Sequence, residues 1–143
     1  MLKDWNKVEQ PTAEEVDKRL ANAKNSLLQQ QIAMKEKKLP VIVLLEGWGA
    51  AGKGSVLGKL IKNIDPRFFK VAVMDEPTEE EKRKPFLYRH FVKIPEAGKF
   101  VFMDSGWMSE VTSQKLSGEL SEEEYKKRIE SIKRFERQLT DNG

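Results

Sequence analysis

Apolar and polar residues follow one another along the chain in blocks that predict both helices and strands. Three short, mainly apolar runs, at 41–45, 68–74 and 100–103, each end at an acidic residue. Runs of this kind are typical of strands buried on both faces of a parallel sheet. Around them, apolar residues recur at helical spacing in residues 12–37, 53–64, 85–92 and 121–139. The alternation predicts an α/β fold with a parallel sheet and flanking helices.

Capping signals fix the expected starts of the helices. Thr12 and Ser121 each precede a glutamate at the third following position, which is the spacing of a capping box. Thr78 and Glu81 repeat this spacing, but Pro85 interrupts the helical pattern after them. We expect Pro85 to open a separate helix that runs to about Val92, because proline is favoured in the first helical turn.

The segment between the first strand and the next helix is rich in glycine and ends in a lysine. Its spacing, G-x-x-x-x-G-K after a buried-type strand, is that of a phosphate-binding P-loop, or Walker A motif. Free backbone N–H groups and the helix N-terminus attract phosphate oxygens, and Lys53 adds an ammonium. The position after the lysine lacks the usual hydroxyl, because it is Gly54. The predicted phosphate- and nucleotide-binding residues are Gly47, Gly49, Ala50, Ala51, Gly52, Lys53, Gly54 and Ser55.

Acidic residues follow the second and third strands, at the edge where ligands of open α/β sheets bind. Asp104 ends the third apolar run and is a candidate ligand of Mg²⁺, as in a Walker B motif. Its alternative role is that of a turn or helix-capping residue. Asp75 and Glu76 end the middle strand and reach the same edge. Two roles are open for Glu76, which either binds a nucleotide or has no ligand.

Basic and aromatic residues supply the remaining candidates. Arg89 is a candidate catalytic clamp, because its planar donor fork matches phosphate oxygens. The neighbouring run 82–84 is expected to be a solvated face, and His90, the only histidine, a packed or surface residue. Trp48 and Trp107 either wall a nucleotide pocket or pack at the edge of the sheet.

Length and composition limit the classes of protein that fit. The chain has 143 residues, the size of one domain, and lacks cysteine, which excludes disulfides and thiolate metal sites. The net charge of +3 is too small to demand nucleic acid. We found neither a membrane span nor a signal peptide in the sequence, so a cytoplasmic location is expected. We divide the chain into a lead-in, 1–11, and a P-loop domain, 12–143, made of an N-terminal helix, 12–38, and an α/β core, 41–143.

Several motifs together resemble a known family. The loop 45–54 looks like the P-loop of the family-2 polyphosphate kinases, which include polyphosphate:AMP phosphotransferases. Further matching segments occur in the family's order: 65–67, 78–81, 84–89, 94–99, 102–107 and 135–139. The resemblance implies a P-loop kinase fold and phosphoryl transfer between polyphosphate and an adenine nucleotide, with Mg²⁺. It also implies that Lys53 contacts the transferring phosphate, that Asp104 holds Mg²⁺ and that Arg89 is a lid arginine.

Departures from the family pattern at Gly49, Ser105 and Met108 bear on the chemistry. The family's loop usually has an aspartate where this chain has Gly49, and its D-R-S-W-Y motif has an arginine and a tyrosine where this chain has Ser105 and Met108. The loop therefore offers no side-chain ligand for Mg²⁺. A missing arginine can cost several kcal/mol of transition-state stabilisation, since arginine fingers are worth about 10³–10⁵ in rate.

The resemblance also implies that the family continues with further strands beyond residue 143. We therefore expect a partial domain whose first strand keeps one unpaired edge, and a chain that forms homo-oligomers or pairs through this open edge. Three functions remain in view. They are a polyphosphate-dependent phosphotransferase with weak or no activity in this form, a non-catalytic half that supports assembly of a two-domain enzyme, and a nucleoside monophosphate kinase.

Overall fold

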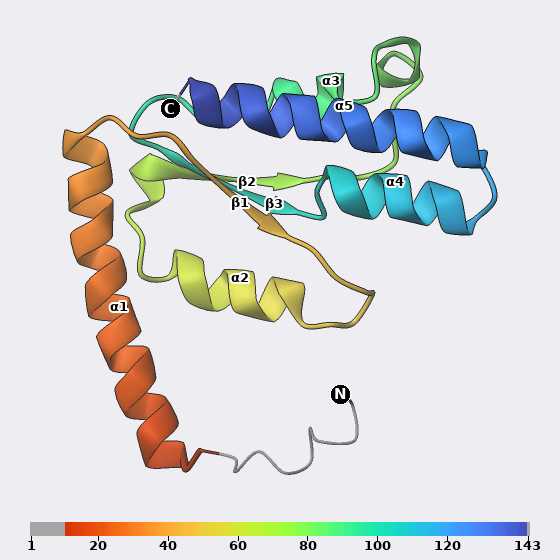
Figure 1. The fold of residues 1–143 in the computed structure, drawn as a ribbon. Helices are drawn as coiled ribbons and strands as arrows, with labels where there is room; N and C mark the ends of the chain where they lie inside the picture. The colour runs from red at the N-terminus through yellow and green to blue at the C-terminus, as the bar shows by residue number, and fades with distance from the viewer. Residues whose placement is uncertain (1–10, 143) are drawn as a thin grey trace.

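A three-stranded parallel sheet lies between two layers of helices in the computed structural model, which describes residues 11–142 (Figure 1). The strands are β1 (Val41–Leu45), β2 (Phe69–Val73) and β3 (Phe100–Asp104). The α-helices are α1 (Ala13–Glu36), α2 (Lys53–Ile61), α3 (Tyr88–Phe91), α4 (Trp107–Leu116) and α5 (Glu122–Asp141). Two 3₁₀ turns, η2 (Pro66–Phe68) and η3 (Glu81–Arg83), stand in the connections around β2. The predicted α/β class is confirmed.

The sheet order is β1-β3-β2, so the last strand in sequence lies in the middle. Four residues of β3, from Phe100 to Met103, are buried, whereas all five residues of β1 are half-buried. The register places Leu45 and Val73 beside Asp104 at the carboxyl end of the sheet. All three strands therefore deliver their last residues to one edge. Within residues 11–142, the outer side of β1 has no strand partner.

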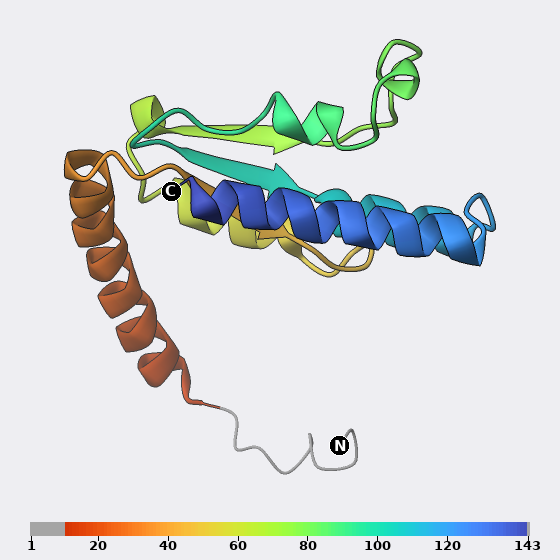
Figure 2. The same ribbon diagram turned by 45° about the horizontal axis from the view of Figure 1, so that its top comes forward.

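Each face of the sheet has its own apolar core. On one face, α1 and α2 cover a cluster that includes Met34, Leu57 and Phe102. On the other, α4 and α5 cover a cluster around Met103, Trp107 and the α5 residues Ile132 and Phe135, as the turned view also shows (Figure 2). The alternation of side chains along β3 explains the division, because successive residues point to opposite faces.

The capping signals start α1 and α5 where the sequence predicts them. Both halves of the capping box form at Thr12 and Ser121. At Thr78 the same two hydrogen bonds form with Glu81, but only the short η3 comes after them. In the connection before β2, Arg67 donates to the carboxylate of Asp65, which lowers the pKa of Asp65 to about 2.

Two expectations about the helices are wrong, and one helix was missed. Pro85 does not open a helix to Val92. Its carbonyl instead accepts from the N–H of Tyr88 in a turn, and α3 covers four residues only. The helix after the glycine loop ends at Ile61 rather than at residue 64, and α4 was not expected at all. Of the predicted lead-in, residues 1–10 lie outside the described residues.

Candidate functional site

The glycine loop connects β1 to α2 at the carboxyl edge of the sheet. Gly47 and Gly52 have φ angles of 150° and 87°, and Ala50 has a φ of 60°. Glycine adopts such angles without the strain that a Cβ adds. Gly52 is the N-cap of α2 and has no side chain that could cap it. The N–H groups of the first helical turn are therefore open to an anion.

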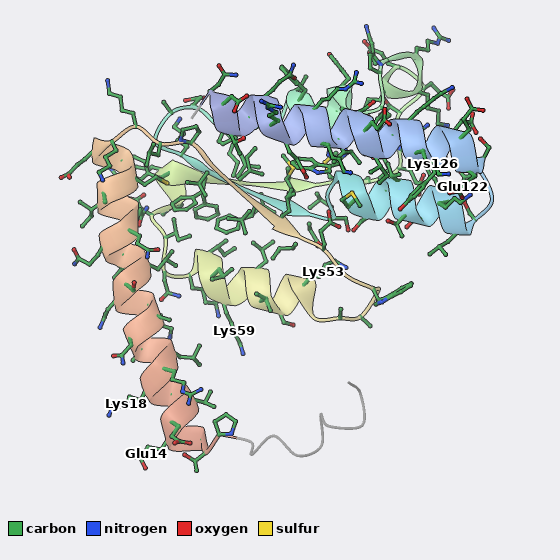
Figure 3. The ribbon with its side chains drawn as sticks, in the orientation of Figure 1. Glu14, Lys18, Lys53, Lys59, Glu122 and Lys126 are labelled. Atoms are coloured by element: carbon green, nitrogen blue, oxygen red, sulfur yellow. The ribbon has the colours of Figure 1, made fainter. Side chains whose placement is uncertain are left out.

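Lys53 stands at the first position of α2, beside the carboxyl end of β1 (Figure 3). Its Nζ donates to the carbonyl oxygens of Gly47 and Trp48, at 3.0 and 3.2 Å. The ammonium thus bonds to loop carbonyls, and the carbonyl of Trp48 also accepts from the N–H of Ala51 at 3.2 Å. Trp48 itself is 79% exposed and does not wall a pocket with the side chains described.

A pocket of about 530 Å³ lies between this loop and the ends of β2 and β3. Residues 50–55 of the loop and Met74, Asp104 and Ser105 line it. Of the predicted phosphate-binding residues, only Gly47 and Gly49 stand outside this lining. The structure therefore brings Lys53 and Asp104 to one pocket.

Asp104 has the property that a metal ligand needs. Its Oδ1 atom is buried and has no hydrogen-bond partner among the described residues. A buried carboxylate oxygen without a partner is costly, unless a ligand supplies the missing interaction. Ser105, the next residue, has a φ of 70°, so the backbone turns sharply just after the carboxylate. Among residues 11–142, no group of three or more His, Cys, Asp or Glu side chains could hold a metal on its own.

Arg89 lies in a second pocket that adjoins the first. This second pocket has a volume of about 320 Å³ and shares Met74 and Ser105 with the loop pocket. Arg89 is buried and donates from Nη2 to the carbonyl of Asp75, while its Nη1 lies 3.9 Å from Glu110. Arg89 is therefore held beside the site by Asp75 and Glu110.

Sequence reasoning missed two contacts that shape the site. Glu110 of α4 holds His90 as well as Arg89, because its Oε2 lies 3.2 Å from the His90 Nε2. Ser109 donates to Glu46 and ties α4 to the start of the glycine loop. Glu110 and Ser109 both stand on α4, and the sequence pattern of this segment did not predict a helix. The isolated Glu46 before the first glycine was the only available hint.

The other aromatic and polar candidates have structural places. His90 is fully buried, and its ring packs edge-to-face on Trp107 at 5.7 Å. The indole of Trp107 donates to Glu136 of α5 at 2.8 Å, so Trp107 is a core residue and not a pocket wall of the glycine loop. Asp75 and Glu76 line the second pocket. The backbone N–H of Thr78 lowers the pKa of Glu81, and the charges of Arg89 and Lys93 lower it further.

Comparisons with known proteins agree on one family. The family model described as "Polyphosphate kinase 2 (PPK2)" matches residues 10–143. A polyphosphate:AMP phosphotransferase of Pseudomonas syringae pv. tomato is 34% identical over 107 residues, which are 75% of this chain and 22% of that protein. An ADP-polyphosphate phosphotransferase 3 of Rhizobium meliloti is 29% identical over 126 residues, which are 88% of this chain and 44% of that protein.

A solved structure has the same fold. The crystal structure of a polyphosphate kinase 2 from Arthrobacter aurescens superimposes with a TM-score of 0.87 at 26% identity, over 94% of this chain and 49% of that one. This chain therefore spans about a fifth to a half of the length of these relatives. Within residues 11–142, every helix is too short or too polar to cross a bilayer.

Proposed function

We propose, from the premise that the chain belongs to the polyphosphate kinase 2 family, that its glycine loop binds phosphate for phosphoryl transfer between polyphosphate and AMP or ADP. The observation that carries this proposal is the pocket that Lys53 shares with the unpaired carboxylate of Asp104. The relatives are a polyphosphate:AMP and an ADP-polyphosphate phosphotransferase, which supports these acceptors.

The chain's own residues would act by holding phosphate groups, since phosphoryl transfer needs positioning and charge stabilisation rather than covalent help. The open N–H groups at the start of α2 would bind phosphate oxygens. The Lys53 ammonium would exchange the carbonyls of Gly47 and Trp48 for a phosphate oxygen. Arg89 would supply a second positive charge from the adjoining pocket.

Asp104 is the residue that fits Mg²⁺. Its buried Oδ1 lacks a partner among the described residues, and oxygen ligands suit this ion. Neither Gly49 nor Gly54 can add a side-chain ligand, so the remaining ligands would come from phosphate and water. When bound, Mg²⁺ would neutralise negative charge on the transferring phosphate.

A phosphotransfer assay with polyphosphate, Mg²⁺ and AMP or ADP tests the proposal. Lys53→Ala should weaken triphosphate binding by about tenfold to a hundredfold, because one charge-assisted hydrogen bond is lost, and should abolish transfer. Lys59→Ala is the matched control. Lys59 stands on the same helix but lines a different groove (Figure 3). Its substitution should therefore leave triphosphate binding and phosphoryl transfer unchanged. Transfer that survives Lys53→Ala would contradict the mechanism.

A second candidate is a non-catalytic half that supports assembly, as the open edge of β1 favours. It predicts phosphate binding without turnover. The variant Gly49→Asp discriminates between the two candidates. The aspartate side chain should fit without disturbing the loop, because a Cβ at Gly49 would meet nothing within 4 Å. If the missing aspartate were the only defect, this variant would gain activity, and the assembly candidate would be wrong. The nucleoside monophosphate kinase alternative has no specific observation in its favour, since Gly54 leaves the loop without its hydroxyl.

A further inference from the structure

The two adjoining pockets differ in charge. The loop pocket is lined by one cation, Lys53, and one carboxylate, Asp104, and the open N–H groups at the start of α2 add positive potential there. The second pocket is lined by one cation, Arg89, and by four carboxylates, which leaves its lining with a net charge of −3. The four carboxylates are those of Asp75, Glu76, Glu110 and Glu119.

Arg89 is the group in the second pocket that attracts phosphate. It is 7% exposed, and its buried Nε atom has no hydrogen-bond partner among the described residues. The rest of its donor fork meets the carbonyl of Asp75 and, at 3.9 Å, the carboxylate of Glu110. A polyphosphate chain would therefore find a donor here as well as at the glycine loop.

Two of the four carboxylates are not committed to holding Arg89. Glu76 comes after the end of β2 and is exposed. Glu119 comes after the end of α4 and is also exposed. It accepts from the hydroxyl of Ser117 at 2.6 Å, a hydrogen bond that leaves its negative charge in place. Both carboxylates therefore act on the second pocket through their charge.

Two cations near these carboxylates bond to other groups. Glu79 and, more weakly, Glu76 raise the pKa of Lys82, and the ammonium of Lys82 bonds to Glu79 at 2.7 Å. Arg128 of α5 donates to Gln114 at the wall of the second pocket, at 2.6 Å, but is not among the residues that line this pocket. The potential inside the second pocket is therefore negative.

We propose that Glu76 and Glu119 are specificity-determining residues, whose charges keep polyphosphate out of the second pocket and confine it to the glycine loop. This role rests on the proposed function, because it matters where one anionic substrate can occupy the place of the other. Repulsion of a wrong ligand is a general source of selectivity. The repulsion grows with the charge of the ligand, so a polyphosphate chain is rejected strongly and an uncharged nucleoside is not.

Equilibrium dialysis against tripolyphosphate tests this role in a Lys53→Ala background, where binding at the loop is weakened. At low salt, Glu76→Gln and Glu119→Gln together should tighten binding by about tenfold to a hundredfold, because two like charges beside a multiply charged anion are removed. At about 1 M salt the gain should fall to about twofold or less, since exposed charges are then screened. An affinity that the two substitutions leave unchanged at low salt would overturn the proposal.

The matched control is the pair Glu80→Gln and Glu123→Gln in the same background. Each of these glutamates stands four residues after its counterpart, is exposed and lies outside the lining of the second pocket. The control changes the net charge of the chain by the same amount, and it should change the affinity by less than about twofold. An equal gain in both pairs would overturn the proposal, because the net charge of the whole chain would then be the cause.

His90 reports where the anion binds. It is the only histidine of the chain, it neighbours Arg89 in sequence, and its ring shares the carboxylate of Glu110 with that arginine. Tripolyphosphate that enters the second pocket should therefore shift the NMR signals of this imidazole. Tighter binding that leaves these signals unshifted would place the anion elsewhere and would also overturn the proposal.

The exclusion of polyphosphate and the proposed function can fail separately. A wild type that binds tripolyphosphate no more tightly than Lys53→Ala would contradict the phosphate-binding loop, whereas the comparison of the two glutamate pairs does not depend on the loop. Circular dichroism should show the same helix content in both pairs, since the replaced side chains are exposed and glutamine keeps a hydrogen-bonding oxygen.

Discussion

At the scale of single residues, the site depends on a close approach between Gly106 and Glu46. A Cβ added at Gly106 would lie 2.5 Å from the Oε1 atom of Glu46 and 3.1 Å from the Cδ2 atom of Leu44. The same glutamate accepts from Ser109 on α4. Because Gly106 has no side chain, α4 can start in direct contact with Glu46, the residue before the first glycine of the loop.

Gly106→Ala should lower the free energy of unfolding by about 1–2 kcal/mol, because the added methyl group overpacks this contact and alanine is a poor N-cap. Urea denaturation measures the change. Gly58→Ala is the control. A Cβ there meets nothing within 4 Å, and Gly58 lies inside α2, so this change should stabilise the chain by about 0.5–1 kcal/mol.

The contact with Glu46 can be isolated from the capping effect. In a Glu46→Ala background, the part of the cost of Gly106→Ala that comes from this clash should disappear, whereas the capping cost and the contact with Leu44 should remain. An undiminished cost in that background would show that the clash with Glu46 is not its source.

The roles of single residues could be predicted from the sequence where a local motif indicated them. The loop spacing predicted Lys53, and the end of an apolar run predicted Asp104, and the structure places both on one pocket. Glu110 was not predictable, because its contacts with Arg89 and His90 join positions 20 and 21 residues apart on two short helices. Such contacts depend on how helices pack, which one sequence does not reveal.

At the scale of the elements, two capping boxes with the same hydrogen-bond pattern stand in different surroundings. Ser121 starts α5, which packs Ile132 and Phe135 into the core. Thr12 starts α1, whose first half is exposed. A cap contributes to global stability only where the turn that it stabilises is coupled to the core.

Ser121→Ala should therefore lower the free energy of unfolding by about 1 kcal/mol, the usual cost of a lost cap. Thr12→Ala should change it by no more than a few tenths and should instead increase local fraying of α1. Urea denaturation reports the first effect, and amide hydrogen exchange in the first turns of α1 reports the second. Equal losses of global stability would contradict this distinction.

The same contrast explains which helices the pattern could predict. Both capping boxes mark long helices, and both starts are confirmed. The missed helix α4 buries only Trp107 and Val111, and its remaining surface is rich in serine, threonine and charged residues. Two buried positions on a short helix do not establish a period. The short α3 likewise failed to match the longer helix expected after Pro85.

At the scale of the whole molecule, the backbone of β1 leaves hydrogen-bonding groups without a partner strand among the described residues. The N–H of Val41 bonds to the carbonyl of Lys99, and the carbonyl of Leu45 accepts from Ser105, both on the side of β3. Because a strand alternates the direction of these groups, Ile42 and Leu44 direct theirs to the outer side. This edge is entirely apolar, whereas β2 carries the exposed Lys70, and a charge on an edge discourages pairing.

The edge of β1 should therefore act as an association surface of this chain. Association of the chain at high concentration should then depend on the backbone of β1. Ile42→Pro should abolish it, because proline removes an outward N–H without removing a bond to β3. Ile42→Ala loses the same side chain but keeps that N–H, so it should still associate. Light scattering at matched concentrations measures both. Equal scattering from the proline and alanine variants would show that backbone pairing at β1 does not drive the association, and its half-buried apolar side chains would then be the cause.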